Sequence, residues 1–262
     1  MAVVSDPLAI TEDAFLGGAL RIRQPAHGYR AGLDAILLAA ACPAERGRAE
    51  RCLDCGAGVG VVGLAVARRV DDIDVALIER DPVLASLARE NVVANKLGGR
   101  VRVIERDLTA PLMQMPELAS ETNTYDHVLA NPPYHTHGAA TRAPDALKDV
   151  SHAMLAGEFE HWARFAAAMT RDRGTFTVIH RADALDEILA GLRRRFGAIR
   201  IVPLHPRDGV AASRVLVQAT KASRAALEIL PGRMLHAPGE HVFAAEFDAI
   251  LRNGAPFSLQ PV

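Results

Sequence analysis

Two periodicities divide the chain into alternating elements. Short apolar runs bounded by turn residues predict β-strands, and longer stretches with apolar residues every three to four positions predict helices. The predicted strands are 51–54, 75–79, 101–106, 125–130, 174–180, 198–204 and 215–219, with a short one at 227–230. The predicted helices are 35–41, 59–70, 82–95, 158–169, 184–195 and 242–251. This alternation predicts an α/β fold, in which a mostly parallel sheet is covered by helices on both faces.

Two segments depart from the alternation. The strand at 215–219 follows its predecessor too closely for a helical crossover, so we predict that it pairs antiparallel. Residues 15–24 contain a glycine pair and alternating side chains that predict a small hairpin, whereas 1–14 show no periodicity and are expected to be loose. We therefore expect an appendage of hairpin and helix at 1–48, followed by the main domain at 49–262.

A glycine-rich run lies at 53–63, between a predicted strand and a predicted helix. Glycine there supplies unusual dihedrals and lets a ligand approach the backbone. In open α/β sheets such ligands bind at the carboxyl ends of the strands. Gly58-x-Gly60-x-x-Gly63, with Glu79 about 20 residues later, matches the dinucleotide fingerprint and makes an NAD-binding oxidoreductase one alternative. That alternative leaves Asp54 and a later Asn-Pro-Pro-Tyr turn without a role.

The tetrapeptide Asn131-Pro132-Pro133-Tyr134 directly follows the predicted strand 125–130. Each proline restricts the residue before it to extended conformations, which holds Asn131 and Pro132 stiffly. The Asn131 side-chain oxygen and the Pro132 carbonyl can accept the two hydrogens of a planar exocyclic amine. They would favour a pyramidal nitrogen whose lone pair points at a methyl donor, and Tyr134 can stack on the flat acceptor. The turn therefore predicts transfer of a methyl group to nitrogen.

The pattern Asp54-x-Gly56-x-Gly58-x-Gly60 resembles the S-adenosylmethionine site of class I methyltransferases. That resemblance implies a Rossmann-like fold with a mostly parallel seven-stranded sheet and one antiparallel strand. It also implies that Glu79 binds the ribose hydroxyls, that Asp107 contacts the adenine amino group, and that Asn131 lies beside the cofactor. The tetrapeptide itself resembles the signature of N-methyltransferases acting on adenine, cytosine or glutamine side-chain amides.

The stretch 28–39 resembles the opening of bacterial tRNA (adenine-N6) methyltransferases that modify a valine tRNA beside its anticodon. The resemblance implies that three of its residues help to close over the cofactor: Tyr29, Arg30 and Asp34. It makes tRNA the expected partner, whose target adenine would be turned out of its stack and held between side chains. For the base we predict Pro133 and Tyr134, and for phosphates Arg142 and Lys148 in the long polar stretch 135–157.

The amino-acid composition bears on the binding partner and on the cellular compartment. The net charge of −1, from 30 basic and 31 acidic residues, gives no general electrostatic case for nucleic acid binding, so any basic surface must be local. Three cysteines fit a reducing cytoplasm, and no leader or membrane span is expected. We expect no metal, and a monomer or homodimer. Methylation of a protein glutamine or a small molecule, on nitrogen or oxygen, stays open as an alternative.

Overall fold

The computed structural model describes residues 9–133, 158–237, 239 and 242–259. Its centre is a nine-stranded sheet in the order β10-β8-β9-β7-β6-β3-β4-β5, with β11 also paired to β8. The strands are β3 Glu50–Cys55, β4 Ile73–Glu79, β5 Val101–Glu105, β6 Tyr125–Ala130, β7 Thr170–Arg181, β8 Phe196–His205, β9 Arg214–Lys221, β10 Glu228–Ile229 and β11 Arg233–Met234.

Strand directions follow the predicted pattern. Strands β5, β4, β3, β6 and β7 are mutually parallel, and β9 is antiparallel to both β7 and β8. The antiparallel pairing of β9 is thus confirmed. The two-residue strands β10 and β11 extend the sheet beyond the expected seven strands, and β10 lies within the predicted 227–230.

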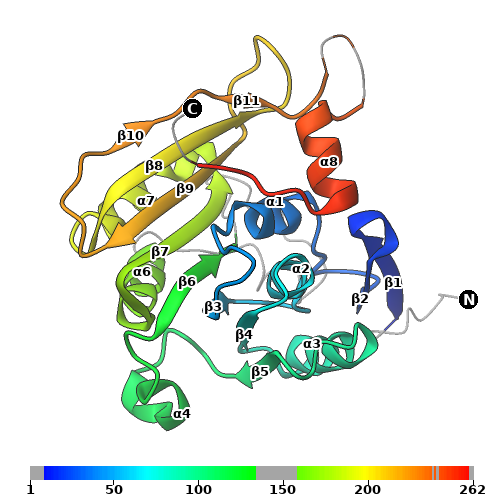
Figure 1. The fold of residues 1–262 in the computed structure, drawn as a ribbon, viewed down its shortest axis with the longest axis vertical. Helices are drawn as coiled ribbons and strands as arrows, with labels where there is room; N and C mark the ends of the chain where they lie inside the picture. Colours follow the sequence, from blue (N-terminus) through cyan, green and yellow to red (C-terminus); the bar gives the residue numbers. More distant parts are fainter. Residues whose placement is uncertain (1–8, 134–157, 238, 240–241, 260–262) are drawn as a thin grey trace, which may run out of the picture.

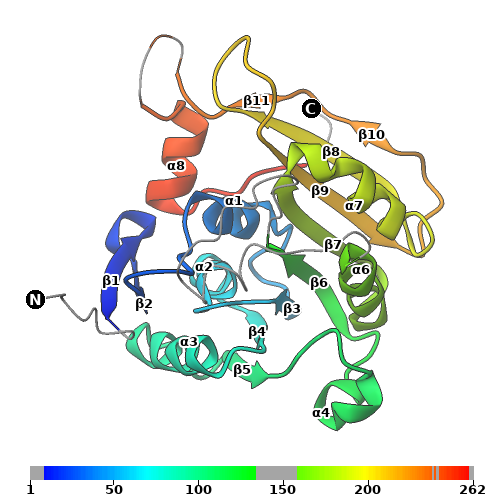
Figure 2. The same ribbon diagram turned by 180° about the vertical axis from the view of Figure 1, so that it is seen from behind.

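Helices cover both faces of this sheet (Figures 1 and 2). They are α1 Leu33–Ala41, α2 Val61–Arg69, α3 Pro82–Ala94, α4 Pro116–Ala119, α6 Glu158–Met169, α7 Leu185–Leu192 and α8 Ala245–Asn253. Short 3₁₀ turns lie at Leu16–Gly18 (η1), Leu112–Gln114 (η2) and Ala182–Ala184 (η3). Helix α3 starts as its sequence predicts, because Asp81 caps it by accepting from the N–H groups of Val83 and Leu84, with Pro82 in its first turn.

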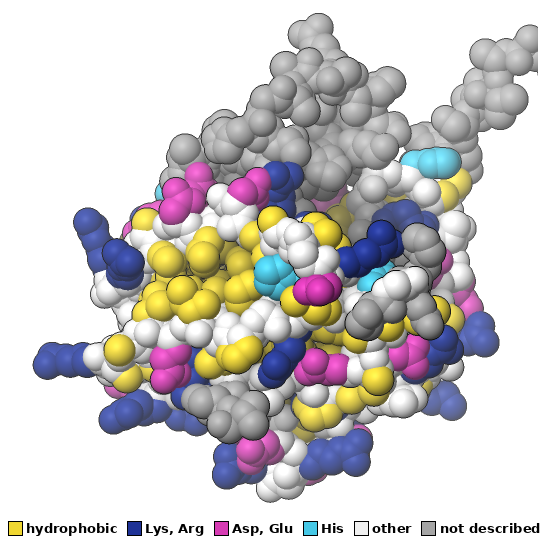
Figure 3. Space-filling model, turned by 90° about the horizontal axis from the view of Figure 1, so that it is seen from above, with side chains coloured by type: hydrophobic (Ala, Val, Ile, Leu, Met, Phe, Trp, Pro, Cys, Tyr) yellow, Lys and Arg dark blue, Asp and Glu magenta, His cyan; other side chains and the backbone are white. Residues whose placement is uncertain are grey.

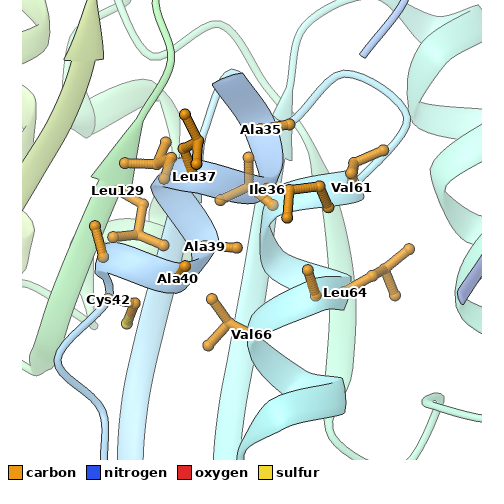
Figure 4. Packing of buried hydrophobic residues seen from close by; sticks show 14 of the residues in the cluster. Ala35, Ile36, Leu37, Ala39, Ala40, Cys42, Val61, Leu64, Val66 and Leu129 are labelled. Carbon is orange, nitrogen blue, oxygen red and sulfur yellow. The ribbon is translucent and has the colours of Figure 1, made fainter. Parts of the chain in front are cut away.

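The core has two layers because strand side chains alternate between the faces. Leu77 and Leu129 belong to the cluster that holds α1, α2 and α3, whereas their neighbours Ile78 and Ala130 belong to the cluster under α6 and α7. Figure 4 shows the first layer, in which the small residues of α1 pack closely against Val61, Leu64 and Val66 of α2.

The hairpin at the amino terminus is longer than predicted. Strand β1, Ile10–Phe15, pairs antiparallel with β2, Leu20–Pro25, so the expectation that residues 10–14 are loose is wrong. Strand β1 could not be predicted because neither of its faces is fully buried, so it leaves no clear apolar alternation. It is a strand because it pairs with β2. In β2, by contrast, Leu20 and Ile22 are fully buried.

The carboxyl-terminal segment packs against the amino-terminal elements. Helix α8 lies beside α1 and η1 (Figure 1), and beyond it the N–H of Phe257 donates to the Ala40 carbonyl at 2.9 Å. Phe247 and Phe257 share the core cluster of α1. The appendage is therefore joined to the main domain through one core, and a boundary at residue 48 stays a prediction.

Among the residues that the structure describes, no helix is long and apolar enough to cross a membrane. All three cysteines, Cys42, Cys52 and Cys55, are free and buried.

Candidate functional site

The carboxyl ends of three central strands meet at one level of the sheet. In the parallel register Cys55 pairs with Ile78 of β4 and with Ala130 of β6. The next residues along each strand are therefore neighbours: Gly56, Glu79 and Asn131. This edge of the sheet is where open α/β proteins bind their ligands.

The glycine turn between β3 and α2 requires glycine for two separate reasons. Gly56, Gly58 and Gly60 have φ angles of 66°, 56° and 91°, which side chains rarely tolerate. A Cβ at Gly58 would also lie 2.1 Å from the Tyr29 hydroxyl, and one at Gly56 would lie 2.5 Å from the Trp162 ring. The turn is thus shaped by backbone conformation and by two aromatic side chains packed on it.

Glu79 is fixed by the backbone around it. Its side chain is 8% exposed, and its Oε1 accepts from the N–H groups of Arg80 and Asp81, both at 2.8 Å. Its Oε2 accepts from the N–H of Gly58 at 2.8 Å, which ties β4 to the glycine turn. Since each carboxylate oxygen has two lone pairs, Oε2 keeps one acceptor position for a ligand. That suits the predicted contact with ribose hydroxyls.

Asp54 adds a second buried carboxyl group. It is 1% exposed and accepts from the N–H of Gly63, in the first turn of α2, at 3.0 Å. Burial raises its pKa to about 7, with a further contribution from the charge of Glu79. Burial likewise raises the pKa of the Tyr29 phenol, which faces both acids. In the described ranges no Lys, Arg or His forms an ion pair with Asp54 or Glu79. Glu79, whose carboxylate is held beside the glycine turn, therefore offers an acceptor that fits the ribose hydroxyls of S-adenosylmethionine.

The raised pKa of Asp54 predicts how stability changes with pH. The folded chain binds a proton at this carboxyl up to about pH 7, whereas the unfolded chain releases it near 3.8. The Asp54 contribution therefore lowers the free energy of unfolding as the pH rises through that window. We expect Asp54→Asn to remove this slope, measured by urea unfolding of the cofactor-free protein between about pH 5 and pH 8. Equal slopes in the two proteins would contradict the assignment.

The other predicted residues of this edge follow β5 and β6. Asp107 follows β5, and its Oδ1 accepts from the Thr109 N–H at 2.9 Å and hydroxyl at 2.7 Å. Its Oδ2 lies 3.9 Å from Arg80 Nη1. Directly after β6, Asn131 and Pro133 are half-buried and Pro132 is buried. Tyr134, Arg142 and Lys148 lie outside the described residues.

Two of the three residues predicted to close over the cofactor bind other parts of the chain. Arg30 donates to Asp13 at 2.7 Å and to Thr11 at 2.8 Å, both on β1. Asp34 pairs with Arg214 of β9 at 2.8 Å. These contacts fasten 28–39 to the hairpin and the sheet, and cofactor roles for Arg30 and Asp34 stay predictions. Tyr29 alone of the three packs on the glycine turn.

Two residues near this edge were missed by sequence reasoning. The sequence alone assigns Trp162 on α6 equally well to the core or to an interface, but its ring lies against Gly56. His180 lies next to the last residue of β7, two residues past Val178, which is the register partner of Ala130. It is 5% exposed, and burial lowers its pKa to about 4, so it is neutral near pH 7. A histidine at the carboxyl end of a strand beside β6 was the available signal.

Trp162 gives this site a spectroscopic reporter, because it is the sole tryptophan of the chain. We expect S-adenosylmethionine to change the emission of Trp162, with half-saturation at the dissociation constant obtained by calorimetry. Trp162→Phe should remove the signal while calorimetry still detects binding. Calorimetric binding without any emission change in the unaltered protein would place the cofactor away from Gly56.

A separate cavity of about 330 Å³ opens at the opposite edge of the sheet, at the amino ends of β3 and β5. Its arginines are engaged within the chain: Arg51 and Arg102 both pair with Glu121, and Arg100 donates to the Val70 carbonyl. It is therefore distinct from the edge that carries Glu79 and Asn131.

Comparisons with known proteins point to one class of enzyme. Residues 33–162 match the methyltransferase small domain family. A crystal structure described as a predicted O-methyltransferase from Agrobacterium tumefaciens is 33% identical, with a TM-score of 0.71, over 86% of this chain and 98% of that one.

Two curated relatives share the name tRNA1(Val) (adenine(37)-N6)-methyltransferase. The protein from Bacteroides thetaiotaomicron is 24% identical over 85% of this chain and 89% of its own length. The protein from Cronobacter sakazakii is 34% identical over 44% of each chain, so this match spans less than half of that relative. With the fold, the similarity to the Agrobacterium structure shows that the chain belongs to the S-adenosylmethionine-dependent methyltransferases, and its residues 33–162 match the methyltransferase small domain.

Proposed function

We propose that this enzyme transfers a methyl group from S-adenosylmethionine to the exocyclic amine of an adenine in tRNA. One observation carries the proposal: the Asn131–Pro132 turn leaves β6 at the same level of the sheet as Gly56 and Glu79. A donor bound at the glycine turn and an acceptor bound at Asn131 would then be neighbours. A tRNA substrate also implies a cytoplasmic enzyme.

The chemistry required of the chain is positioning. The cofactor supplies an electrophilic methyl group, so the acceptor nitrogen needs only an exposed, correctly aimed lone pair. The Asn131 side-chain oxygen and the Pro132 carbonyl would each accept one amino hydrogen, which favours a pyramidal nitrogen whose lone pair is withdrawn from conjugation with the ring. Because the following prolines restrict the backbone at Asn131 and Pro132, the two acceptors would favour the transition state with little reorganisation. The methylated nitrogen then releases its proton readily, so a strong base is unnecessary.

The tRNA assignment is supported by the names of the curated relatives and by the resemblance of 28–39. Basic side chains available for phosphate contacts are scattered. On the coloured surface of Figure 3, Lys and Arg alternate with Asp and Glu and do not form one continuous patch. Arg195 pairs with Glu160 at 2.6 Å, whereas Arg193 and Arg194, after α7, are exposed. We therefore propose that RNA contacts are few and local, with Arg142 and Lys148 among them.

A second candidate acceptor is a hydroxyl group. It is favoured by the Agrobacterium relative, whose crystal structure is described as that of a predicted O-methyltransferase. A protein glutamine is the corresponding nitrogen alternative to tRNA, because its amide also offers two hydrogens to Asn131 and Pro132.

The test supplies methyl-labelled S-adenosylmethionine with bulk tRNA, a protein extract or small metabolites, and then identifies the labelled product. We expect label in tRNA, recovered as N6-methyladenosine after digestion to nucleosides. Label confined to protein or to small molecules would overturn the tRNA proposal, and label on a ribose oxygen would favour the second candidate. A reaction without enzyme serves as the background control.

A further inference from the structure

Asn91 of α3 contacts both the amino-terminal hairpin and the glycine turn. Its side chain is fully buried, and its Nδ2 donates to the carbonyls of Val59 and Arg23, both at 3.0 Å. Its Oδ1 accepts from the N–H of Arg23 at 2.8 Å. We propose that Asn91 is a positioning residue for the cofactor, which holds the glycine turn in its binding shape by tying Val59 to the docked hairpin. The proposal rests on the glycine turn as the cofactor site and is independent of the acceptor.

The bonds of Asn91 account for its place inside a helix. Asparagine is a poor helix former, and a buried amide without partners costs free energy. Here both N–H groups and one oxygen lone pair of the amide are used by three backbone groups. The carbonyl of Val59 receives its hydrogen bond from outside its own turn, from a helix that follows the next strand.

Val59 is the point of the turn where such a tether has most effect. It is fully buried and lies between Gly58 and Gly60, which both have positive φ angles and few steric restraints. The Tyr29 hydroxyl reaches the backbone of Val59 as well, so Val59 is held both from α3 and from the segment that follows the hairpin. Losing the Asn91 bond would leave the Val59 carbonyl without its partner and free the two glycines to rotate.

Asn95 provides a natural matched control one helical turn later. Its Oδ1 accepts from the N–H of Arg21 at 3.0 Å, and its Nδ2 donates to the Arg21 carbonyl at 2.7 Å. The two asparagines therefore bind alternate residues of the same edge of β2, each as a neighbouring strand would. The remaining bond of Asn95 goes to the Asn91 carbonyl within α3, at 2.8 Å, and not to the glycine turn.

The experiment compares Asn91→Ala with Asn95→Ala. Each loses the same pair of bonds to β2, so we expect similar decreases in Tm. Only Asn91→Ala should raise the dissociation constant and the KM for S-adenosylmethionine, by about tenfold, the effect of one lost hydrogen bond at a buried carbonyl. Its kcat at saturating cofactor should stay within about threefold of the unaltered enzyme, because Asn131 is untouched.

Equal losses of cofactor affinity in the two variants, or none in Asn91→Ala, would overturn the proposal. If Asn91→Ala does not fold, Asn91→Leu replaces it, since leucine fills a similar volume and removes the donor to Val59 without burying a charge. Unchanged cofactor affinity in that variant also overturns the proposal. Binding is measured by calorimetry without tRNA, so a wrong acceptor assignment would not affect the result. S-adenosylmethionine failing to bind the unaltered protein at the glycine turn would instead refute the proposed function.

Discussion

Asn131→Ala is expected to lower kcat for methyl transfer by about 100- to 1000-fold, the usual cost of losing one fixed polar group that acts in a transition state. The dissociation constant for S-adenosylmethionine should change by less than about threefold, because we propose that the cofactor binds at Gly58 and Glu79, whose hydrogen bond the substitution leaves intact. Single-turnover kinetics and calorimetry measure the two quantities separately.

The control for this variant is Asn253→Ala, an exposed asparagine at the end of α8. It should leave both kcat and cofactor affinity unchanged. A large loss of cofactor affinity in Asn131→Ala, with kcat preserved at saturation, would mean that Asn131 binds the donor and does not orient the acceptor.

Glu79→Ala is expected to weaken S-adenosylmethionine binding by at least about 100-fold. The variant removes the acceptor for the ribose and also the buried partner of three backbone N–H groups, each costing about 1–3 kcal/mol when left unsatisfied. The Gly58 N–H is among them, so the glycine turn loses its link to β4. Calorimetric titration measures the affinity, and thermal unfolding measures the accompanying loss of stability.

Glu105→Ala is the matched control, since Glu105 is the register partner of Glu79 on β5. Its exposed carboxylate pairs with Arg89 at the surface, at 3.0 Å, and exposed pairs contribute little. Cofactor affinity should be unchanged in Glu105→Ala. If the two variants bound S-adenosylmethionine equally well, Glu79 would not belong to the cofactor site.

Periodicity predicted the elements that bury a clear face. Strand β6 and helix α6 have the predicted bounds, 125–130 and 158–169, because apolar side chains on one or both faces decide where they lie. The sequence also predicts that Gly56, Glu79 and Asn131 lie close together, since parallel strands present their carboxyl ends at one edge of a sheet.

Contacts between segments far apart in the chain could not be predicted from a single sequence. Strand β1 is ordered by β2, and the Asn91 amide reaches Val59 across 32 positions, neither of which leaves a local periodic pattern. Trp162 on Gly56 is a contact of the same kind. A pair of asparagines four residues apart inside a predicted helix was the one available clue to Asn91 and Asn95, because that spacing places two poor helix formers on one face.

The atom that receives the methyl group tests the central claim most directly. The measurement uses tRNA with ¹⁵N-labelled adenine and S-adenosylmethionine with a ¹³C-labelled methyl group, followed by NMR of the purified modified nucleoside. If Asn131 and Pro132 present an exocyclic amine to the cofactor, the methyl carbon will show a one-bond coupling to N6 of adenosine. Coupling to a ring nitrogen, or a methyl carbon on oxygen with no nitrogen coupling, would contradict this account.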